Sequence, residues 1–488
     1  MSDQVRYLEP KGLWNHFADL NAIPRASKKE EQAIQFMVDF AKSLNLKYVV
    51  DEVGNVIIDK PASPGMEDRV PIVMQGHLDM VHQKNGDTQF DFATEGIKMY
   101  VEGDWVKAKG TTLGSDNGVG VAAIMAILSS TDIAHPAIQG LFTIDEETGM
   151  TGAIGLKGGL LHGEILLNLD TEDDDELTIG CAGGIDVSAN GSYDQDDTDP
   201  DHIAIKVCLK GLKGGHSGVD IELGRANANK LMNRLLSNAT EFFEVRVASI
   251  DGGGLRNAIP RESFAIVTLP PDQKEQLLEY LKEEEAIFQT EYRITDPNLE
   301  IEVEDALLPA KVCREDFQAD FILAVYTCQN GIFRMSPDIP GLVQTSNNLA
   351  RILVKDGQYE VLCLTRSSVD TEKFDLASTI AASFVLIDAD IELNGEYPGW
   401  EPRPDAPIIK IMSELYQELF KAPAKVAAIH AGLECGILGT HYPDMQMISF
   451  GPNIYGAHSP DERCQITSVQ KSWLLLLETL KRIPTQTA

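Results

Sequence analysis

Seven histidine and acidic side chains in this chain fall where predicted strands end or a predicted helix begins. They lie in the segments G-H-L-D-M, G-S-D-N-G, D-E-E-T-G, N-L-D-T-E and A-H-S-P-D-E, and they are His77, Asp79, Asp116, Glu146, Glu147, Asp170 and His458. Ligands of open α/β sheets bind at the carboxyl ends of the strands. We therefore expect these segments to meet in one crevice.

Such a crevice would need cations. Two like charges about 4 Å apart repel by about 4 kcal/mol at an effective dielectric constant of 20. Two divalent ions would be balanced by Asp116, Glu147, Asp170 and one hydroxide, with His77 and His458 as neutral ligands. Histidine and carboxylate ligands suit zinc, with Co²⁺ or Mn²⁺ as substitutes. Two ions bridged by a carboxylate and a water suit metal-assisted hydrolysis.

The elements that must position these residues alternate between strand and helix. Short apolar runs predict strands at 53–58, 71–75, 141–144, 165–169, 425–429 and 445–450, with helices at 118–128 and 406–420. This alternation predicts an α/β catalytic domain, a sandwich around a mostly parallel sheet. Ser27 and Glu30 are predicted to form a capping box for the helix that follows them.

A change in the sequence pattern near residue 180 predicts a second domain. Gly180, Gly183 and Gly184 form a joint, and N-G-E-Y-P-G-W at 394–400 forms another. We therefore predict a catalytic domain made of residues 1–184 and 398–488, interrupted by an inserted α+β lid and dimerisation domain at 185–397.

Composition excludes several classes of function. The chain has 41 Lys+Arg and 75 Asp+Glu, a formal net charge of −34, which disfavours binding to nucleic acid or anionic membranes. No apolar stretch is long enough to cross a bilayer. The seven cysteines lack a C-x-x-C pair, and the first residues do not read as a signal peptide, so a cytoplasmic protein is expected.

The motifs, taken in order, resemble those of the zinc aminoacylase/carboxypeptidase superfamily of cocatalytic metallopeptidases. Within it, L-D-M-V-H-Q-K, G-L-K-G-G-H-S-G and I-H-A-G-L-E-C-G-I-L are most similar to the bacterial aminoacyl-histidine dipeptidases, also called peptidase D or cytosolic non-specific dipeptidases. The resemblance covers nearly the whole chain. It implies a homodimer that hydrolyses small peptides. One departure is His82, which stands where the family has proline.

The resemblance also implies a role for each residue of the catalytic domain. His77 and Asp170 would bind one metal ion, Glu147 and His458 the other, and Asp116 would bridge them. Asp79 would orient the His77 imidazole, and Glu146 would be the general base that activates the bridging water. A cis peptide bond between Asp116 and Asn117 is implied as well.

Three residues of the inserted domain match family positions that contact the substrate. His216, in G-G-H-S-G, would reach the reacting carbonyl, while Asn257 and Arg366 would hold the substrate, the guanidinium suiting a C-terminal carboxylate. The expected function is a dinuclear zinc dipeptidase acting on Xaa-His and other unblocked dipeptides. Glu434 and Glu172 are candidate partners for the substrate ammonium group.

Two alternatives remain open from the sequence. The first is an N-acyl amino acid deacylase or a tripeptide aminopeptidase, which would use the same metals and base but differ at the amine end of the substrate. The second is a catalytically silent metal-binding protein of the same fold, which we expect to lack a ligand or the base.

Overall fold

The computed structural model describes residues 2–486, which divide into two compact units. The first contains the residues up to Gly180, Trp400–Ala428 and those from Leu433 onward. The second contains Cys181–Gly399 and Ile429–Gly432. These boundaries lie within a few residues of the predicted ones, except that 429–432 groups with the second unit although we assigned it to the catalytic domain.

The first unit is built on an eight-stranded sheet in the order β1-β2-β6-β3-β7-β23-β8-β22. The strands are β1 (Lys47–Val50), β2 (Val56–Lys60), β6 (Ile138–Thr143), β3 (Ile72–His77), β7 (Ile165–Asn168), β23 (Gln446–Ser449), β8 (Glu176–Cys181) and β22 (Lys425–Ile429). The four central strands β6, β3, β7 and β23 pair in parallel, whereas β1, β2 and β8 pair antiparallel. The α/β fold class is therefore confirmed, with the parallel strands at the centre of the sheet.

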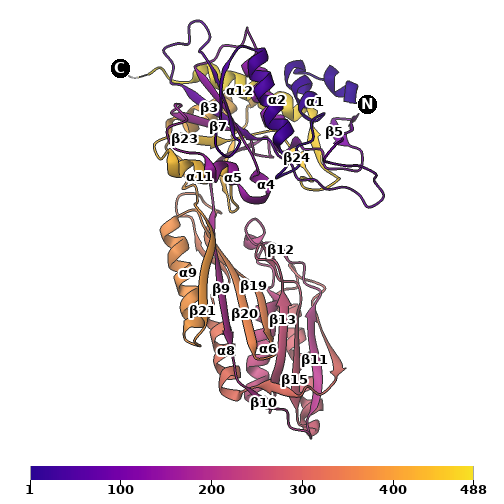
Figure 1. Cartoon of the computed structure of the whole chain (residues 1–488). Coiled ribbons are helices and arrows are strands. Elements are labelled where there is room, and N and C mark those ends of the chain that lie inside the picture. The colour runs from indigo at the N-terminus through magenta and orange to yellow at the C-terminus, as the bar shows by residue number, and fades with distance from the viewer. Residues whose placement is uncertain (1, 487–488) are drawn as a thin grey trace. The chain divides into compact units, whose positions relative to one another are not determined.

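Helices flank this sheet, as the upper part of Figure 1 shows. They are η1 (Ser2–Tyr7), α1 (Lys11–Leu20), α2 (Glu31–Ser43), α3 (Ser115–Ser129), α4 (Glu146–Gly149), α5 (Thr151–Gly155), α10 (Pro407–Phe420), α11 (Glu434–His441) and α12 (Ile466–Arg482). Every residue of α3 from Gly118 to Leu128 is buried. A helix that is apolar on all sides packs inside a domain, and α3 contacts both α1 and β3.

A small antiparallel sheet completes the first unit. It contains β24 (Ile454–Tyr455), β25 (Arg463–Gln465), β5 (Trp105–Ala108) and β4 (Met99–Glu102), in that order. Because β25 pairs with β5, the C-terminal segment that follows His458 is tied to residues more than 350 positions earlier. Among the described residues, no helix combines the length and the apolar character that a membrane span requires.

The second unit is an antiparallel sheet covered by helices. The sheet has nine strands in the order β16-β11-β15-β13-β19-β20-β9-β21, with β18 beside β19. Their bounds are β16 (Glu300–Ala306), β11 (Ile203–Lys210), β15 (Ser263–Leu269), β13 (Arg246–Gly253), β19 (Val343–Lys355), β20 (Gln358–Ser367), β9 (Gly183–Ser192), β21 (Asp390–Tyr397) and β18 (Gly331–Met335). Two short pairs accompany it: β10 (Gln195–Asp197) with β17 (Lys311–Cys313), and β12 (Gly215–His216) with β14 (Ala258–Ile259).

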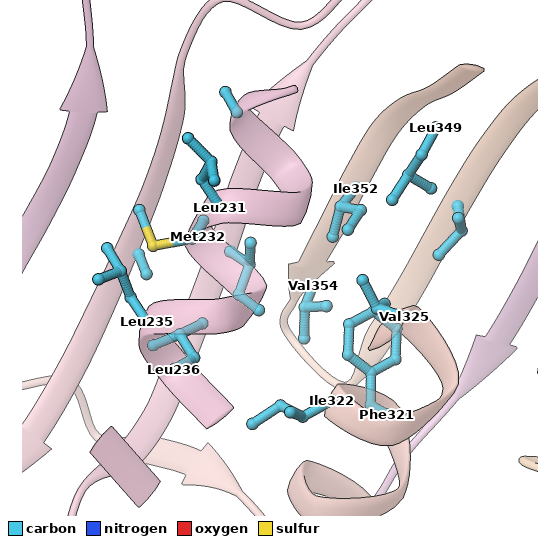
Figure 2. Close-up of a cluster of buried hydrophobic side chains, with 14 of the residues drawn as sticks. Leu231, Met232, Leu235, Leu236, Phe321, Ile322, Val325, Leu349, Ile352 and Val354 are labelled. Atoms are coloured by element: carbon cyan, nitrogen blue, oxygen red, sulfur yellow. The ribbon is translucent and has the colours of Figure 1, made fainter. Parts of the chain in front are cut away.

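The core of the second unit lies between this sheet and its helices. The helices that contribute to it are α6 (Ala228–Phe242), α7 (Lys274–Glu291), α8 (Glu315–Thr327) and α9 (Asp370–Val385), while the short η2 (Ile221–Leu223) and η3 (Pro271–Gln273) lie outside this core. Figure 2 shows apolar side chains of α6 and α8 facing those of β19. The α6 members are Leu231, Met232, Leu235 and Leu236, which recur at helical spacing and so share one face.

We expect Phe321→Ala to lower the free energy of unfolding of the second unit by about 3–5 kcal/mol, because Phe321 is 2% exposed within this core and its removal leaves a cavity. Urea unfolding followed by circular dichroism measures this. Ile294→Ala, at a side chain 76% exposed, is the matched control and should change the value by less than about 0.5 kcal/mol. Equal effects of the two substitutions would contradict this description of the core.

Candidate metal centre

The predicted site residues of the first unit converge at one edge of its sheet. His77 is the last residue of β3, Glu146 and Glu147 begin α4 just after β6, and Asp170 follows β7. Since β6, β3 and β7 are parallel neighbours, their carboxyl ends share this edge. Asp116 lies in the first turn of α3.

Two groups of possible metal ligands form at this edge. In one, Nε2 of His77 lies 3.2 Å from Oδ1 of Asp116 and 3.5 Å from Oδ1 of Asp170. In the other, Nε2 of His458 lies 3.3 Å from Oδ2 of Asp116 and 3.0 Å from Oε2 of Glu147. Asp116 thus offers one oxygen to each group. Glu146 joins His77 and Glu147 in a third cluster, whose ligand atoms lie within 4.8 Å of one another.

Asp79 lies behind His77, on the side of the ring away from these groups. Its carboxylate is 3.3 Å from Nδ1 of His77 and accepts hydrogen bonds from the backbone N–H groups of Glu146 (3.0 Å) and Glu147 (3.3 Å) and from the hydroxyl of Ser27 (2.8 Å). Asp79 is fully buried. One carboxylate therefore links the end of β3 to the start of α4.

The peptide bond between Asp116 and Asn117 is cis, which confirms the expectation drawn from the resemblance. The side-chain amide of Asn117 donates to the backbone carbonyl of Leu169 (2.6 Å) and to the carboxylate of Asp170. Asn117 therefore joins the start of α3 to the loop that carries Asp170.

The predicted capping box at Ser27 and Glu30 is wrong. The helix α2 begins at Glu31, and neither side chain caps it. Ser27 donates to Asp79 instead, and Oε1 of Glu30 accepts from the backbone N–H groups of Lys28 (2.8 Å) and Asp145 (3.1 Å). Both side chains of the S-x-x-E motif therefore make contacts beside the site and do not cap the helix.

The carboxylates at this edge carry more negative charge than the protein alone can balance. Hydrogen bonds to Asp116 and Glu147 raise the pKa of His458 to about 11. Burial, followed by the charges of Asp116 and Asp170, raises the pKa of Glu172 to about 9. Burial also raises the pKa of Glu146 well above its usual value, with Asp170 and other nearby acids adding to the effect. In each case the raised pKa keeps a proton on the side chain, at a place where a bound cation would otherwise balance the negative charge. The donor set therefore fits a pair of divalent ions.

The three predicted substrate residues all lie in the second unit. Nδ1 of His216 accepts from the backbone N–H groups of Gly218 and Val219, both at 3.1 Å, so a neutral His216 carries its proton on Nε2. Burial and the nearby charge of Arg366 lower the pKa of His216, which favours this neutral form.

Arg366 is almost fully buried, and its side-chain hydrogen bonds go to neutral groups. Its guanidinium donates to the hydroxyls of Tyr397 (2.6 Å) and Ser217 (3.4 Å), and among the described residues no carboxylate lies within ion-pair distance of it. The backbone N–H of Ser217 in turn donates to the carbonyl of Asn257 at 2.8 Å, while Asn257 itself is exposed. The structure thus connects the Arg366, His216 and Asn257 segments through Ser217.

Two supporting residues had not been predicted. Arg25, which is 2% exposed, donates to the backbone carbonyls of Leu78, Asp79 and Gly114. Glu462 is also buried and bonds to the start of α3. No sequence pattern singles out Arg25, whereas Glu462 ends the motif A-H-S-P-D-E and could have been noticed there. His82 is exposed and packs edge-to-face on Phe92, away from the ligand groups.

A sheet edge with two His–carboxylate groups that share one aspartate is typical of hydrolases that use paired cations. The family description "Peptidase family M20/M25/M40" matches residues 73–482. The chain therefore belongs to this peptidase family and is a peptide-bond hydrolase.

Proteins that align with nearly the whole chain support this assignment. The chain is 41% identical over 481 residues to the cytosol non-specific dipeptidase of Escherichia coli, covering 99% of both chains. It is 42% identical to a solved aminoacylhistidine dipeptidase from Vibrio alginolyticus, with a TM-score of 0.93 and full coverage of both chains. A solved aminopeptidase from Bacillus cereus, at 14% identity and a TM-score of 0.57, covers 98% of this chain and 99% of its own length and shares the fold.

We expect Asp79→Ala to lower the free energy of unfolding of the metal-free protein by about 1–3 kcal/mol, because the buried N–H groups of Glu146 and Glu147 lose their acceptor. Chemical denaturation in the presence of a chelator measures this. Asp132→Ala removes an exposed aspartate from the same unit and serves as the control. An Asp79→Ala protein as stable as the control protein would contradict the proposed link.

Proposed function

We propose that this protein is a cytoplasmic dinuclear metal dipeptidase that hydrolyses unblocked dipeptides, Xaa-His dipeptides among them. The observation that carries the proposal is Asp116, whose two oxygens each lie beside a separate histidine. The names of the relatives from E. coli and V. alginolyticus support the substrate class, and the first name also supports the compartment.

The two ligand groups would each hold one divalent cation. His77 and Asp170 would bind the first, Glu147 and His458 the second, and Asp116 would bridge them. Nitrogen and carboxylate donors favour Zn²⁺, with Co²⁺ or Mn²⁺ as alternatives. When bound, the ions supply Lewis acidity, which lowers the pKa of a water and polarises the scissile carbonyl.

Glu146 would be the general base. It is half-buried at the start of α4, and its backbone is held by Asp79. In that position it would accept a proton from the attacking water and then deliver that proton to the leaving amine. Asp79 would keep the His77 ring in one orientation, a task typical of carboxylates behind a metal-binding histidine.

The second unit would contribute polar groups that bind the substrate. Arg366 carries a buried charge with no carboxylate within ion-pair distance among the described residues, and a substrate carboxylate would supply one. Neutral His216 would offer its Nε2–H to a substrate oxygen, and Asn257 would offer a further polar contact.

Glu434 would bind the substrate ammonium group. It is 1% exposed, and its Oε2 accepts from the side chains of Gln75 and Thr143, both at 2.6 Å. Its Oε1 has no hydrogen-bond partner among the described residues. An ammonium group would satisfy that oxygen, whereas an N-acyl group would leave it unpaired, so this residue favours a dipeptidase over a deacylase.

A panel of peptides tests the proposed activity. We expect the metal-loaded protein to hydrolyse Xaa-His dipeptides, including β-alanyl-histidine, and to act at least ~100-fold less efficiently on N-acetyl amino acids and tripeptides. An N-acetyl group removes the ammonium group, and a tripeptide holds its two charged ends further apart than a dipeptide does. Chelation should abolish turnover, and Zn²⁺ should restore it. Assays of kcat/KM with each substrate measure this.

Glu146→Gln provides the matched control for the panel. It should lower kcat by at least ~10²-fold while the protein still binds two metal equivalents, because it removes the base and keeps the ligands. Faster hydrolysis of N-acetyl amino acids would indicate a deacylase, and faster hydrolysis of tripeptides an aminopeptidase. Metal binding without any hydrolysis would indicate a protein that only binds metal.

We also propose that the protein is a homodimer formed through the second unit. Large apolar side chains are exposed on two consecutive elements of that unit, Leu323 and Tyr326 on α8 and Phe333 and Met335 on β18. Exposed large apolar side chains are typical of interfaces when they lie together on the surface. Analytical ultracentrifugation should give twice the chain mass of 53.5 kDa, and Phe333→Asp should shift it toward the monomer mass. A wild-type monomer at micromolar concentration would contradict the proposal.

A further inference from the structure

Glu462 makes an unusual set of contacts with the start of α3. Its carboxylate is 2% exposed, and it lies four residues after His458. Oε2 accepts from the backbone N–H groups of Leu113 (2.6 Å) and Gly114 (2.9 Å). Oε1 accepts from the backbone N–H of Ser115 (2.7 Å), its hydroxyl (2.6 Å) and the backbone N–H of Asp116 (3.3 Å). Both oxygens are therefore fully engaged.

These contacts replace an ordinary helix cap. The first N–H groups of a helix have no partner inside it, and Gly114, the residue before α3, has a left-handed backbone and no side-chain cap. Asp116 itself has non-helical backbone angles (φ −81°, ψ 112°). The direction of its carboxylate is thus set by a segment that a distant side chain holds in place.

The same residue also anchors the His458 loop. His458 has a left-handed backbone (φ 64°) and is largely exposed, so its own burial does little to fix it. The backbone N–H of Glu462 donates to the carbonyl of Ser459 at 3.1 Å, which ties the loop to the anchored carboxylate. Glu462 therefore connects two segments that each carry one of the proposed ligands.

The two ligand groups differ in this support. On the His77 side, Asp79 lies beside the ring and Asn117 donates to Asp170. On the His458 side, Glu462 is the buried carboxylate that joins the loop to the Asp116 segment. A substitution of Glu462 should therefore weaken cation binding by the His458 group more than cation binding by the His77 group.

We propose that Glu462 is a positioning residue that fixes Asp116 relative to His458 and thereby sets the affinity for the cation held by His458 and Glu147. This inference rests on the proposed function, because it requires those residues to bind a cation. Glu462 does not act on the substrate or as a ligand itself.

Glu462→Gln tests the proposal with little change of shape. The amide group would face at least two backbone N–H groups, so one oxygen's contacts would become repulsive. We expect the second metal equivalent to bind ~10–100-fold more weakly, and the affinity for the first, which also uses Asp116, to fall less because His77 and Asp170 keep their own supports. Competition with a chelating dye measures both affinities, and circular dichroism and the Tm of the metal-free protein show whether the fold is retained.

Asp104→Asn is the matched control. Asp104 accepts from the backbone and hydroxyl of Thr467 at the start of α12, as Glu462 does for α3, but it bonds to none of the ligand segments 113–116 or 456–462. It should leave both metal affinities unchanged. Should Glu462→Gln not fold, Ser115→Ala removes one of the five contacts and should weaken the second equivalent several-fold.

A double-mutant cycle decides whether Glu462 acts through His458. In a His458→Ala background, Glu462→Gln should change metal affinity less than threefold, whereas in a His77→Ala background its effect should persist. Unchanged second-site affinity in Glu462→Gln, or a full effect in the His458→Ala background, would overturn the inference. A wild-type protein that binds fewer than two ions would instead overturn the proposed function.

Discussion

The repulsion between carboxylates at one edge of the central sheet is the constraint on which the rest of the first unit depends. Asp116, Glu147 and Asp170 lie within a few ångströms of two histidines, with Glu146 alongside. In the protein alone, the raised pKa values of His458 and Glu172 show that protons would be retained there. A pair of dications removes this conflict, and the same dications are what a peptide-bond hydrolase of this kind requires.

Holding such a group of charges together needs a polar framework beneath it, and much of that framework is buried. Asp79 accepts from the start of α4, Glu462 accepts from the start of α3, and Arg25 donates to three carbonyls of the loops between them. Buried polar groups are tolerated only when they are hydrogen-bonded. The hydrogen bonds of this framework therefore offset the cost of burying polar groups, and they also fix the directions of the ligand side chains.

The second unit differs from the first in its architecture and in what stabilises it. Its antiparallel sheet and helices form an apolar core that needs no metal. Arg366 is a buried cation of this unit whose hydrogen bonds go to the neutral hydroxyls of Ser217 and Tyr397. A buried charge is costly unless it is paired, and a carboxylate-bearing ligand would pair with it.

The sequence predicted the fold class from its periodic patterns, and it predicted the residues at the sheet edge from their places after predicted strands together with the resemblance to a known family. Alternating strands and helices predicted a parallel core, and the carboxyl ends of parallel strands share one edge, so His77, Glu147 and Asp170 could be expected to meet. The family motifs supplied the cis peptide bond at Asp116, which no periodicity reveals.

Only the tertiary structure decided which side chains support the site. Ser27 and Glu30 have the spacing of a helix cap but bond to Asp79 and to the backbone of Asp145, because long-range burial outweighs a local preference. Arg25 and Glu462 likewise act on residues about 50 to 350 positions away. Local patterns record the periodicity of an element, whereas hydrogen bonds between distant segments exist only once the chain has folded and excluded water from them.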